Sequence, residues 1–161
     1  GAASIGEAAK AVFKDAKNTA FQKRLSQIYN RKDDADMIFQ SNRHKQIFEA
    51  ERLNLRKPGK KALAVLYLLT ADKALWQKTK PFLTDNGKVD LKGVHLGAIS
   101  TDGYALWKAA KEIQTGEKQI SLYELADNGV VSDNAFRLIV KAVTIARYGT
   151  AILNNTEVRY A

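Results

Sequence analysis

The side chains that most often catalyse reactions or bind metals are scarce in this chain. It has two histidines, His44 and His95, and no cysteine. A zinc-binding pair of histidines on a helix needs a spacing of four residues, and neither histidine has such a partner. The nearest candidate for a hydrolytic centre is His95 with Asp90 and Asp102, which the fold would have to bring together. We expect structural or solvated roles for both histidines, no catalytic site and no metal site.

Other ligand-binding motifs are incomplete. Residues 84–91 (TDNGKVDL) have part of the pattern of a calcium loop, but with Gly87 at its sixth position Phe82 and Gly93 would stand at positions one and twelve. Neither can coordinate calcium, so a turn that leads into a short strand is preferred. The glycines that follow are too widely spaced for a phosphate-binding loop, and no Gly-Lys-Ser or Gly-Lys-Thr occurs. We expect no cofactor. The absence of cysteine also excludes a disulfide framework and a thiolate zinc site.

Positive charge is the clearest signal for binding. The net charge is +9, and all of the excess lies in residues 1–100, which hold 19 basic and 10 acidic side chains, whereas residues 101–161 hold 7 of each. The densest cluster is Arg56-Lys57-Pro58-Gly59-Lys60-Lys61, at an expected helix break where the cations would be exposed to phosphates or to an acidic protein surface. Three lysines farther along extend the cluster if they share its face. The candidate basic patch is Arg56, Lys57, Lys60, Lys61, Lys73, Lys78 and Lys80.

Helical spacing predominates among the apolar residues that must position this patch. Polar residues with N-capping side chains precede most of the apolar stripes, and two capping boxes, Ser4 with Glu7 and Ser121 with Glu124, are present. Thr115-Gly116, Asn128-Gly129 and Gly149 supply helix ends. The sequence predicts helices over about residues 5–17, 19–32, 42–55, 60–69, 73–80, 101–114, 122–127 and 134–148.

Two segments depart from the amphipathic pattern. Residues 60–69 are apolar on nearly all sides, which indicates a helix at the centre of the fold. A buried strand is the alternative, but most residues here are good helix formers. Between residues 82 and 100 the helical period disappears, and Asp85-Asn86-Gly87 is typical of a hairpin turn. Five aromatic residues have aliphatic neighbours at helical spacing and are expected in the core: Tyr67, Trp76, Tyr104, Trp107 and Tyr123.

The fold class predicted is mainly α: a single-domain helical bundle of about six to eight helices with a short β-hairpin or irregular segment at residues 82–100. Residues 1–36 are expected to form an N-terminal helical extension that packs on the core or projects from it, and residues 37–161 the helical core. The longest apolar run, Ala62–Leu69, is far shorter than the roughly 18–20 residues that cross a membrane. The first residues lack a secretory signal and begin with Gly, which suggests a processed start, so a cytoplasmic protein is expected.

Five local patterns occur in a characteristic order between about residues 37 and 149. They are Phe39-Gln40-Ser41-Asn42-Arg43-His44-Lys45, residues 64–69 (AVLYLL), Ser100-Thr101-Asp102-Gly103, residues 120–125 (ISLYEL) and Val131-Ser132-Asp133-Asn134. In this order they resemble a family of short uncharacterised bacterial proteins found with phages and mobile elements. The resemblance implies a small helical accessory protein without a known activity. It also implies that Met37 stands where such proteins usually begin.

Two functions follow from these observations. The first is a non-enzymatic module that binds another protein through the N-terminal helices and the 56–61 segment, because the amphipathic N-terminal pair must bury its apolar stripe against the core or a partner. The second is nucleic-acid binding by the same cations through phosphate contacts. The aromatic residues are expected in the core and not on a base-stacking surface.

Overall fold

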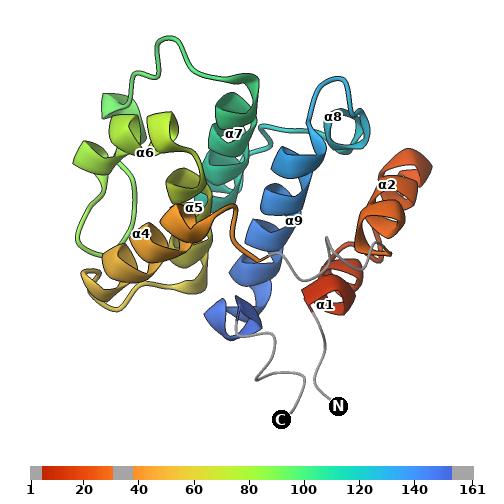
Figure 1. Cartoon of the computed structure of the whole chain (residues 1–161), viewed down its shortest axis with the longest axis horizontal. Coiled ribbons are helices and arrows are strands. Elements are labelled where there is room, and N and C mark those ends of the chain that lie inside the picture. The colour runs from red at the N-terminus through yellow and green to blue at the C-terminus, as the bar shows by residue number, and fades with distance from the viewer. Residues whose placement is uncertain (1–4, 31–37, 154–161) are drawn as a thin grey trace.

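The computed structural model describes residues 5–30 and 38–153, and this part of the chain forms eight α-helices and no strand. The mainly α fold is confirmed (Figure 1). Three short 3₁₀ helices, Lys80–Phe82, Leu91–Gly93 and Thr150–Leu153, complete the description. The α-helices are α1 (Ile5–Val12), α2 (Thr19–Tyr29), α4 (Asn42–Leu53), α5 (Lys60–Ala71), α6 (Lys73–Thr79), α7 (Thr101–Thr115), α8 (Leu122–Ala126) and α9 (Asp133–Tyr148).

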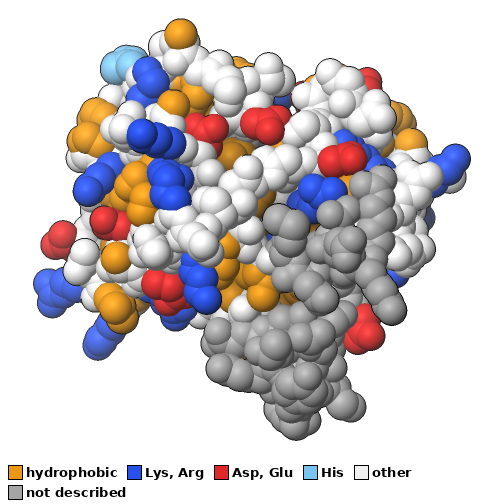
Figure 2. Space-filling model, viewed as in Figure 1, with side chains coloured by type: hydrophobic (Ala, Val, Ile, Leu, Met, Phe, Trp, Pro, Cys, Tyr) orange, Lys and Arg blue, Asp and Glu red, His pale blue; other side chains and the backbone are white. Residues whose placement is uncertain are grey.

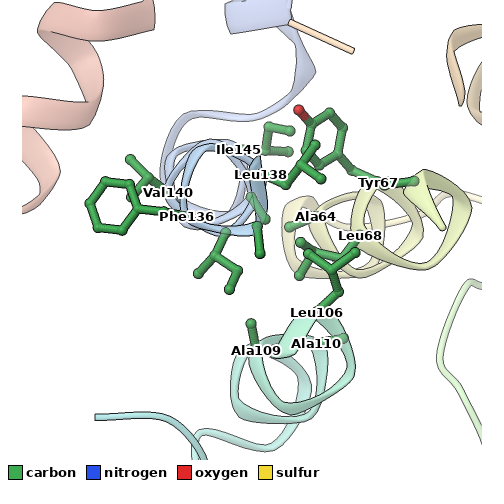
Figure 3. Packing of buried hydrophobic residues seen from close by; sticks show 14 of the residues in the cluster. Ala64, Tyr67, Leu68, Leu106, Ala109, Ala110, Phe136, Leu138, Val140 and Ile145 are labelled. Atoms are coloured by element: carbon green, nitrogen blue, oxygen red, sulfur yellow. The ribbon is translucent and has the colours of Figure 1, made fainter. Parts of the chain in front are cut away.

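Helix α5 is the centre of the bundle. Its residues from Leu63 to Ala71 are all buried, and α5 contacts α4, α6, α7 and α9. In Figure 3, Ala64 and Leu68 of α5 face Leu106 and Ala110 of α7, and α9 lies along a second side of α5. The helix is apolar on every side because it has a neighbour on every side, so the interpretation of residues 60–69 as a central helix is confirmed.

Most helix starts are those that the capping residues predict. The side chains of Asn18, Ser100 and Ser132 each accept a hydrogen bond from a backbone N–H in the first turn that follows. The capping box of Ser121 and Glu124 is present with both of its hydrogen bonds. The other box begins at Ser4, which lies outside the described residues. Local hydrogen bonding therefore fixes where α2, α7, α8 and α9 begin.

The first helix ends at Val12 and not at Lys17, so its predicted length is wrong. The Gln22 side chain donates to the carbonyl oxygens of Phe13 (2.6 Å) and Ala16 (3.0 Å), so it provides a donor for two backbone acceptors in the turn after α1. The chain reverses there, and the Phe13 ring packs against Phe21 with 4.9 Å between centroids. Tertiary contacts between α1 and α2 thus shorten the helix.

The N-terminal pair packs on the core. Helix α1 contacts α9 and α2 contacts α8, on the side of α9 away from α4 (Figure 1). The apolar side chains Ile5, Phe21, Leu25 and Ile28 are each at most 1% exposed. The amphipathic stripe of the N-terminal helices is therefore covered within the chain.

Arg24 of α2 links the N-terminal helices to the core. Its buried guanidinium donates to the carbonyl oxygens of Leu125 (2.7 Å) and Val131 (2.6 Å), and it pairs with the Asp133 carboxylate at 3.0 Å. It also lies over the Phe136 ring, 4.7 Å from the centroid. One side chain of α2 thus joins the end of α8 to the start of α9.

Residues 82–100 form an irregular segment. A single antiparallel bridge joins Leu83 to Val89, and Gly87 in the intervening turn has a φ of 91°. The bridge does not extend into strands because 3₁₀ helices lie on both sides of it, at Lys80–Phe82 and Leu91–Gly93. Of the two predicted forms, the irregular segment is the one observed.

Two of the five aromatic residues expected in the core lie on the surface instead. Tyr67, Trp76 and Trp107 are buried, but Tyr104 is 53% exposed and Tyr123 is 81% exposed. Tyr104 falls on the outer side of α7, beside the Lys108 ammonium, and α8 is a five-residue helix that buries only Leu125. Helical spacing with aliphatic neighbours therefore did not identify the inner face here.

His44 is buried as a neutral side chain. Its Nδ1 accepts a hydrogen bond from the Gln40 backbone N–H (2.9 Å), so the proton is on Nε2, which donates to the Tyr67 carbonyl (2.8 Å). The Tyr67 hydroxyl in turn donates to the Ile38 carbonyl. The pair holds residues 38–40 against the core, which is the structural role expected for this histidine. No helix in the described ranges is long and apolar enough to cross a membrane.

Removal of Arg24 should loosen the N-terminal pair. We expect Arg24→Ala to lower the free energy of unfolding by about 3 kcal/mol, because it leaves two buried carbonyl oxygens without their donor and removes the ion pair with Asp133. Urea unfolding would measure this. Lys23→Ala, at the exposed neighbouring position, is the control, and an equal loss in both variants would contradict the assigned role of Arg24.

Stability should fall in acid because of His44. Burial lowers the pKa of His44 to about 4, from an ordinary value of 6.5, and the positive charges of Arg43 and Lys141 also lower it. Between these pH values the unfolded chain binds the proton more readily, so stability that is fully present above pH 6.5 is lost as the pH falls to 4. The loss amounts to about 3 kcal/mol.

His44→Gln tests this pH dependence, because glutamine can keep a donor and an acceptor but does not titrate in this range. Urea unfolding of both proteins at pH 7, 5.5 and 4 would measure this. The native chain should exceed His44→Gln in free energy of unfolding by an amount that shrinks as the pH falls. An advantage that stays constant across this range would count against the assignment.

Candidate basic binding surface

The turn between α4 and α5 places four of the predicted cations together. We call residues 56–61 the basic turn. Asn54 is the C-cap of α4, Lys57 has a φ of 45°, and Gly59 is the N-cap of α5, which has no side-chain capping bond. A positive φ is uncommon for a residue with a side chain, and it turns the chain sharply before Pro58. Arg56, Lys57, Lys60 and Lys61 are exposed as a result.

A second turn lies against the basic turn. The Arg56 backbone N–H donates to the Asp85 carbonyl oxygen at 2.7 Å. Gly87 packs so closely that a Cβ there would lie 2.9 Å from the Ala62 Cβ and 3.1 Å from the Leu55 Cδ1. No other residue fits this approach together with the positive φ of Gly87. The contact brings Lys88 beside the basic turn.

Asn86 and Gln114 hold the second turn in shape. The Asn86 side-chain oxygen accepts hydrogen bonds from the Lys88 backbone N–H (3.2 Å) and the Thr84 hydroxyl (2.9 Å). The Gln114 amide of α7 both donates to the Val89 carbonyl and accepts from the Val89 N–H, each at 2.9 Å. This pair of bonds is the one that a neighbouring strand would make.

Three open hollows surround Lys88, and we call them together the basic furrow. Lys88 shares one of about 530 Å³ with Arg56 and Asp85, and a second of about 260 Å³ with Lys61 and Gln114. The third, of about 570 Å³, lies beside the end of α7, where Leu91 and Lys92 also line it. The furrow thus joins the basic turn to residues 84–92.

Not all predicted members of the patch belong to this surface. Lys60 reaches the carbonyl of Arg147 at the end of α9 (3.5 Å), and Lys80 forms an ion pair with Glu51 at 3.8 Å. Lys73 follows the far end of α5, about 18 Å from Lys60 for a helix of twelve residues. Lys78 lies beside Gly97. The basic surface therefore extends from the basic turn to Lys88, and not to Lys73, Lys78 or Lys80.

Positive charge is in excess at the basic furrow, whose hollows are lined by four cations and by the carboxylates of Asp85 and Asp90. No carboxylate in the described ranges forms an ion pair with Arg56, Lys57, Lys61 or Lys88. Figure 2 shows Lys and Arg side chains gathered over α4, α6 and the segment that follows, with Asp and Glu side chains between them. On this face the cations therefore lie in a mixed pattern and not in an unbroken track.

The acidic residues considered for hydrolysis are not brought together. Asp102 accepts a hydrogen bond from the Ser132 hydroxyl (2.7 Å) at the start of α7, whereas Asp90 follows Val89, which is bonded to Gln114 near the end of that helix. Twelve helical residues separate these two levels by about 18 Å. Such a distance is incompatible with a catalytic cluster of Asp90 and Asp102. His95 is exposed, and the described residues contain no cluster suited to a metal ion.

Comparisons with protein-family models, with curated proteins and with solved structures found no match to this chain.

Three members of the furrow were missed by reasoning from the sequence. Lys88 and Lys92 lie in the segment that the sequence marks as a turn and strand, so their charge was not added to the 56–61 cluster. Gln114 lies in the last turn of a predicted helix, and nothing in its spacing indicates a bond to Val89. The hairpin signal at Asp85-Asn86-Gly87 was the one available hint that Lys88 would be exposed on a turn.

Gln114 variants should loosen residues 84–92. We expect Gln114→Ala to lower the free energy of unfolding by about 1–2 kcal/mol, because Val89 loses both hydrogen bonds. Gln114→Glu should also lower it, because its carboxylate still accepts from the Val89 N–H but places an oxygen against the Val89 carbonyl. Gln46→Ala, at an exposed position on α4, is the control for urea unfolding. Equal stability of Gln114→Ala and the native chain would show that the Gln114 bonds contribute nothing.

Proposed function

We propose that this chain is a non-enzymatic module that binds an acidic surface of another protein through the basic turn and Lys88. The observation that carries the proposal is a group of four exposed cations, Arg56, Lys57, Lys61 and Lys88, without carboxylate partners in the described residues. Their backbone is fixed by the hydrogen bond between Arg56 and Asp85. An uncompensated positive surface attracts a partner of opposite charge and steers its approach.

The N-terminal helices are not needed as a contact surface in this proposal. Their apolar side chains were expected to lie against either the core or a partner, and they pack on α8 and α9. The interaction surface is therefore narrower than the sequence suggested. It consists of the basic turn and the residues that lie against it.

An exposed apolar side chain favours a protein over a nucleic acid. Leu53, three residues before Arg56, is 83% exposed. Protein interfaces combine apolar contacts with a charged rim, whereas non-specific nucleic-acid binding depends on cations that follow the phosphates. Asp85, which shares a hollow with Arg56, interrupts the row of cations that a phosphate backbone would follow. Charge mixed in this way fits a protein surface better.

The proposed setting follows the resemblance to small proteins of phages and mobile elements. A bacterial, cytoplasmic accessory role remains a prediction. Such an accessory role would suit a protein that binds a partner without catalysing a reaction.

Charge reversal at the basic turn tests the proposal. The native chain, an Arg56→Glu/Lys57→Glu variant and a Lys73→Glu control would each be immobilised and exposed to bacterial lysate with and without nuclease treatment, and retained proteins would be identified by mass spectrometry. We expect one acidic protein to be retained by the native chain and the control, and to be lost by the double variant, which opposes charges of the same sign.

Two results would contradict the proposal. One is retention that disappears on nuclease treatment, which would indicate that nucleic acid is the ligand. The other is equal retention by all three proteins. A salt titration with a short DNA duplex separates the two functions further, because phosphate contacts make affinity fall steeply with salt concentration.

A further inference from the structure

The basic furrow has a lining that a flat charged surface would not need. Ala62 and Val65 line the hollow between Lys61 and Lys88, and Val89 and Leu91 line the one beside α7. Cations therefore stand at the rims of hollows that have apolar side chains in their walls. This combination suits a ligand with both carboxylates and apolar side chains.

The arrangement of the hollows favours an extended ligand. All three meet at Lys88, and each is open to solvent. A small molecule would be mostly enclosed by its pocket, which these hollows do not provide. A chain that crosses Lys88 can enter more than one hollow, because side chains of an extended segment alternate in direction every residue.

Recognition must come from side chains. The N–H and carbonyl of Val89, which a strand-like ligand would use, are already bonded to Gln114. Addition of a strand at this edge is therefore blocked while the Gln114 amide stays in place. A ligand in the furrow would therefore be bound through charged and apolar side chains.

We propose that the basic furrow binds an extended acidic segment of a protein, with carboxylates at Lys61, Lys88 and Lys92 and an apolar side chain against Leu91. This inference rests on the proposed function and names the kind of partner. Charge complementarity supports it, because the three hollows are lined by four cations, Arg56, Lys61, Lys88 and Lys92, and by only two carboxylates, those of Asp85 and Asp90.

Dye-labelled twelve-residue peptides would serve as probes. One alternates Glu and Leu, and its control alternates Glu and Ser, so that the two carry the same charge. Fluorescence anisotropy would measure their affinity for the native chain, for Lys88→Glu, for Leu91→Ser and for Lys73→Glu. Urea unfolding would establish that each variant is folded. Changes in the chemical shifts of the Gln114 side-chain amide during NMR titrations would show that the peptide binds at the furrow.

We expect the Glu-Leu peptide to bind at least tenfold more tightly than the Glu-Ser peptide. Lys88→Glu should weaken both peptides more than tenfold, and Lys73→Glu should weaken neither by more than twofold. Leu91→Ser should reduce the difference between the peptides. If Leu91→Ser does not fold, movement of the Gln114 side-chain signals by the Glu-Leu peptide alone provides the same test on the native chain.

Several results would overturn the inference. Equal affinities for the two peptides, or equal effects of Lys88→Glu and Lys73→Glu, would indicate general charge attraction. Competition by a short DNA duplex at the same site and with greater affinity would indicate a nucleic-acid ligand. The Leu91→Ser variant separates this inference from the proposed function, because it alters the apolar wall of the furrow and leaves the cations in place. A cellular partner that is lost by the Arg56→Glu/Lys57→Glu variant but is still retained by Leu91→Ser would refute only this inference.

Discussion

The burial of α5 is the constraint on which the rest of this structure depends. Nine consecutive residues, Leu63 to Ala71, have no exposed side. A helix of this composition is stable in water only when other elements enclose it, and α4, α6, α7 and α9 do so here. Only its first turn, with Lys60 and Lys61, leaves the core. The basic residues thus mark the point where a buried helix reaches the surface.

The candidate binding surface follows from that exit point. Residues 84–88 pack over the first turn of α5 because Gly87 lies against Ala62, and the Arg56 backbone joins the two turns through Asp85. Gln114 of α7 attaches Val89 to the helix that runs beside α5. The cations therefore stand on backbone that the core holds in position, which is what a preorganised binding surface requires.

The sequence was informative where interactions are local. Helix capping and the apolar character of a segment depend on neighbours within a few positions, so both could be predicted from the sequence alone. This holds for the caps Asn18, Ser100, Ser121 and Ser132 and for residues 62–69. Lys88 could not be assigned to the basic turn, because 27 residues separate it from Lys61 and only the packing of Gly87 brings them together. Tyr104 was misplaced for a related reason: both sides of α7 carry apolar residues, and the position of α5 decides which side is inner.

The central claim is that the two turns form one fixed surface, and native-state hydrogen exchange of the Arg56 and Val89 amides tests it most directly. The Arg56 hydrogen is donated across the contact between the turns, to the Asp85 carbonyl, and the Val89 hydrogen is donated to the Gln114 side chain, which attaches the second turn to α7. The account predicts exchange at least about 100-fold slower than in an unfolded peptide for both amides. Unprotected exchange at Arg56 and Val89, with α5 still protected, would show that the turns move independently and would contradict the account.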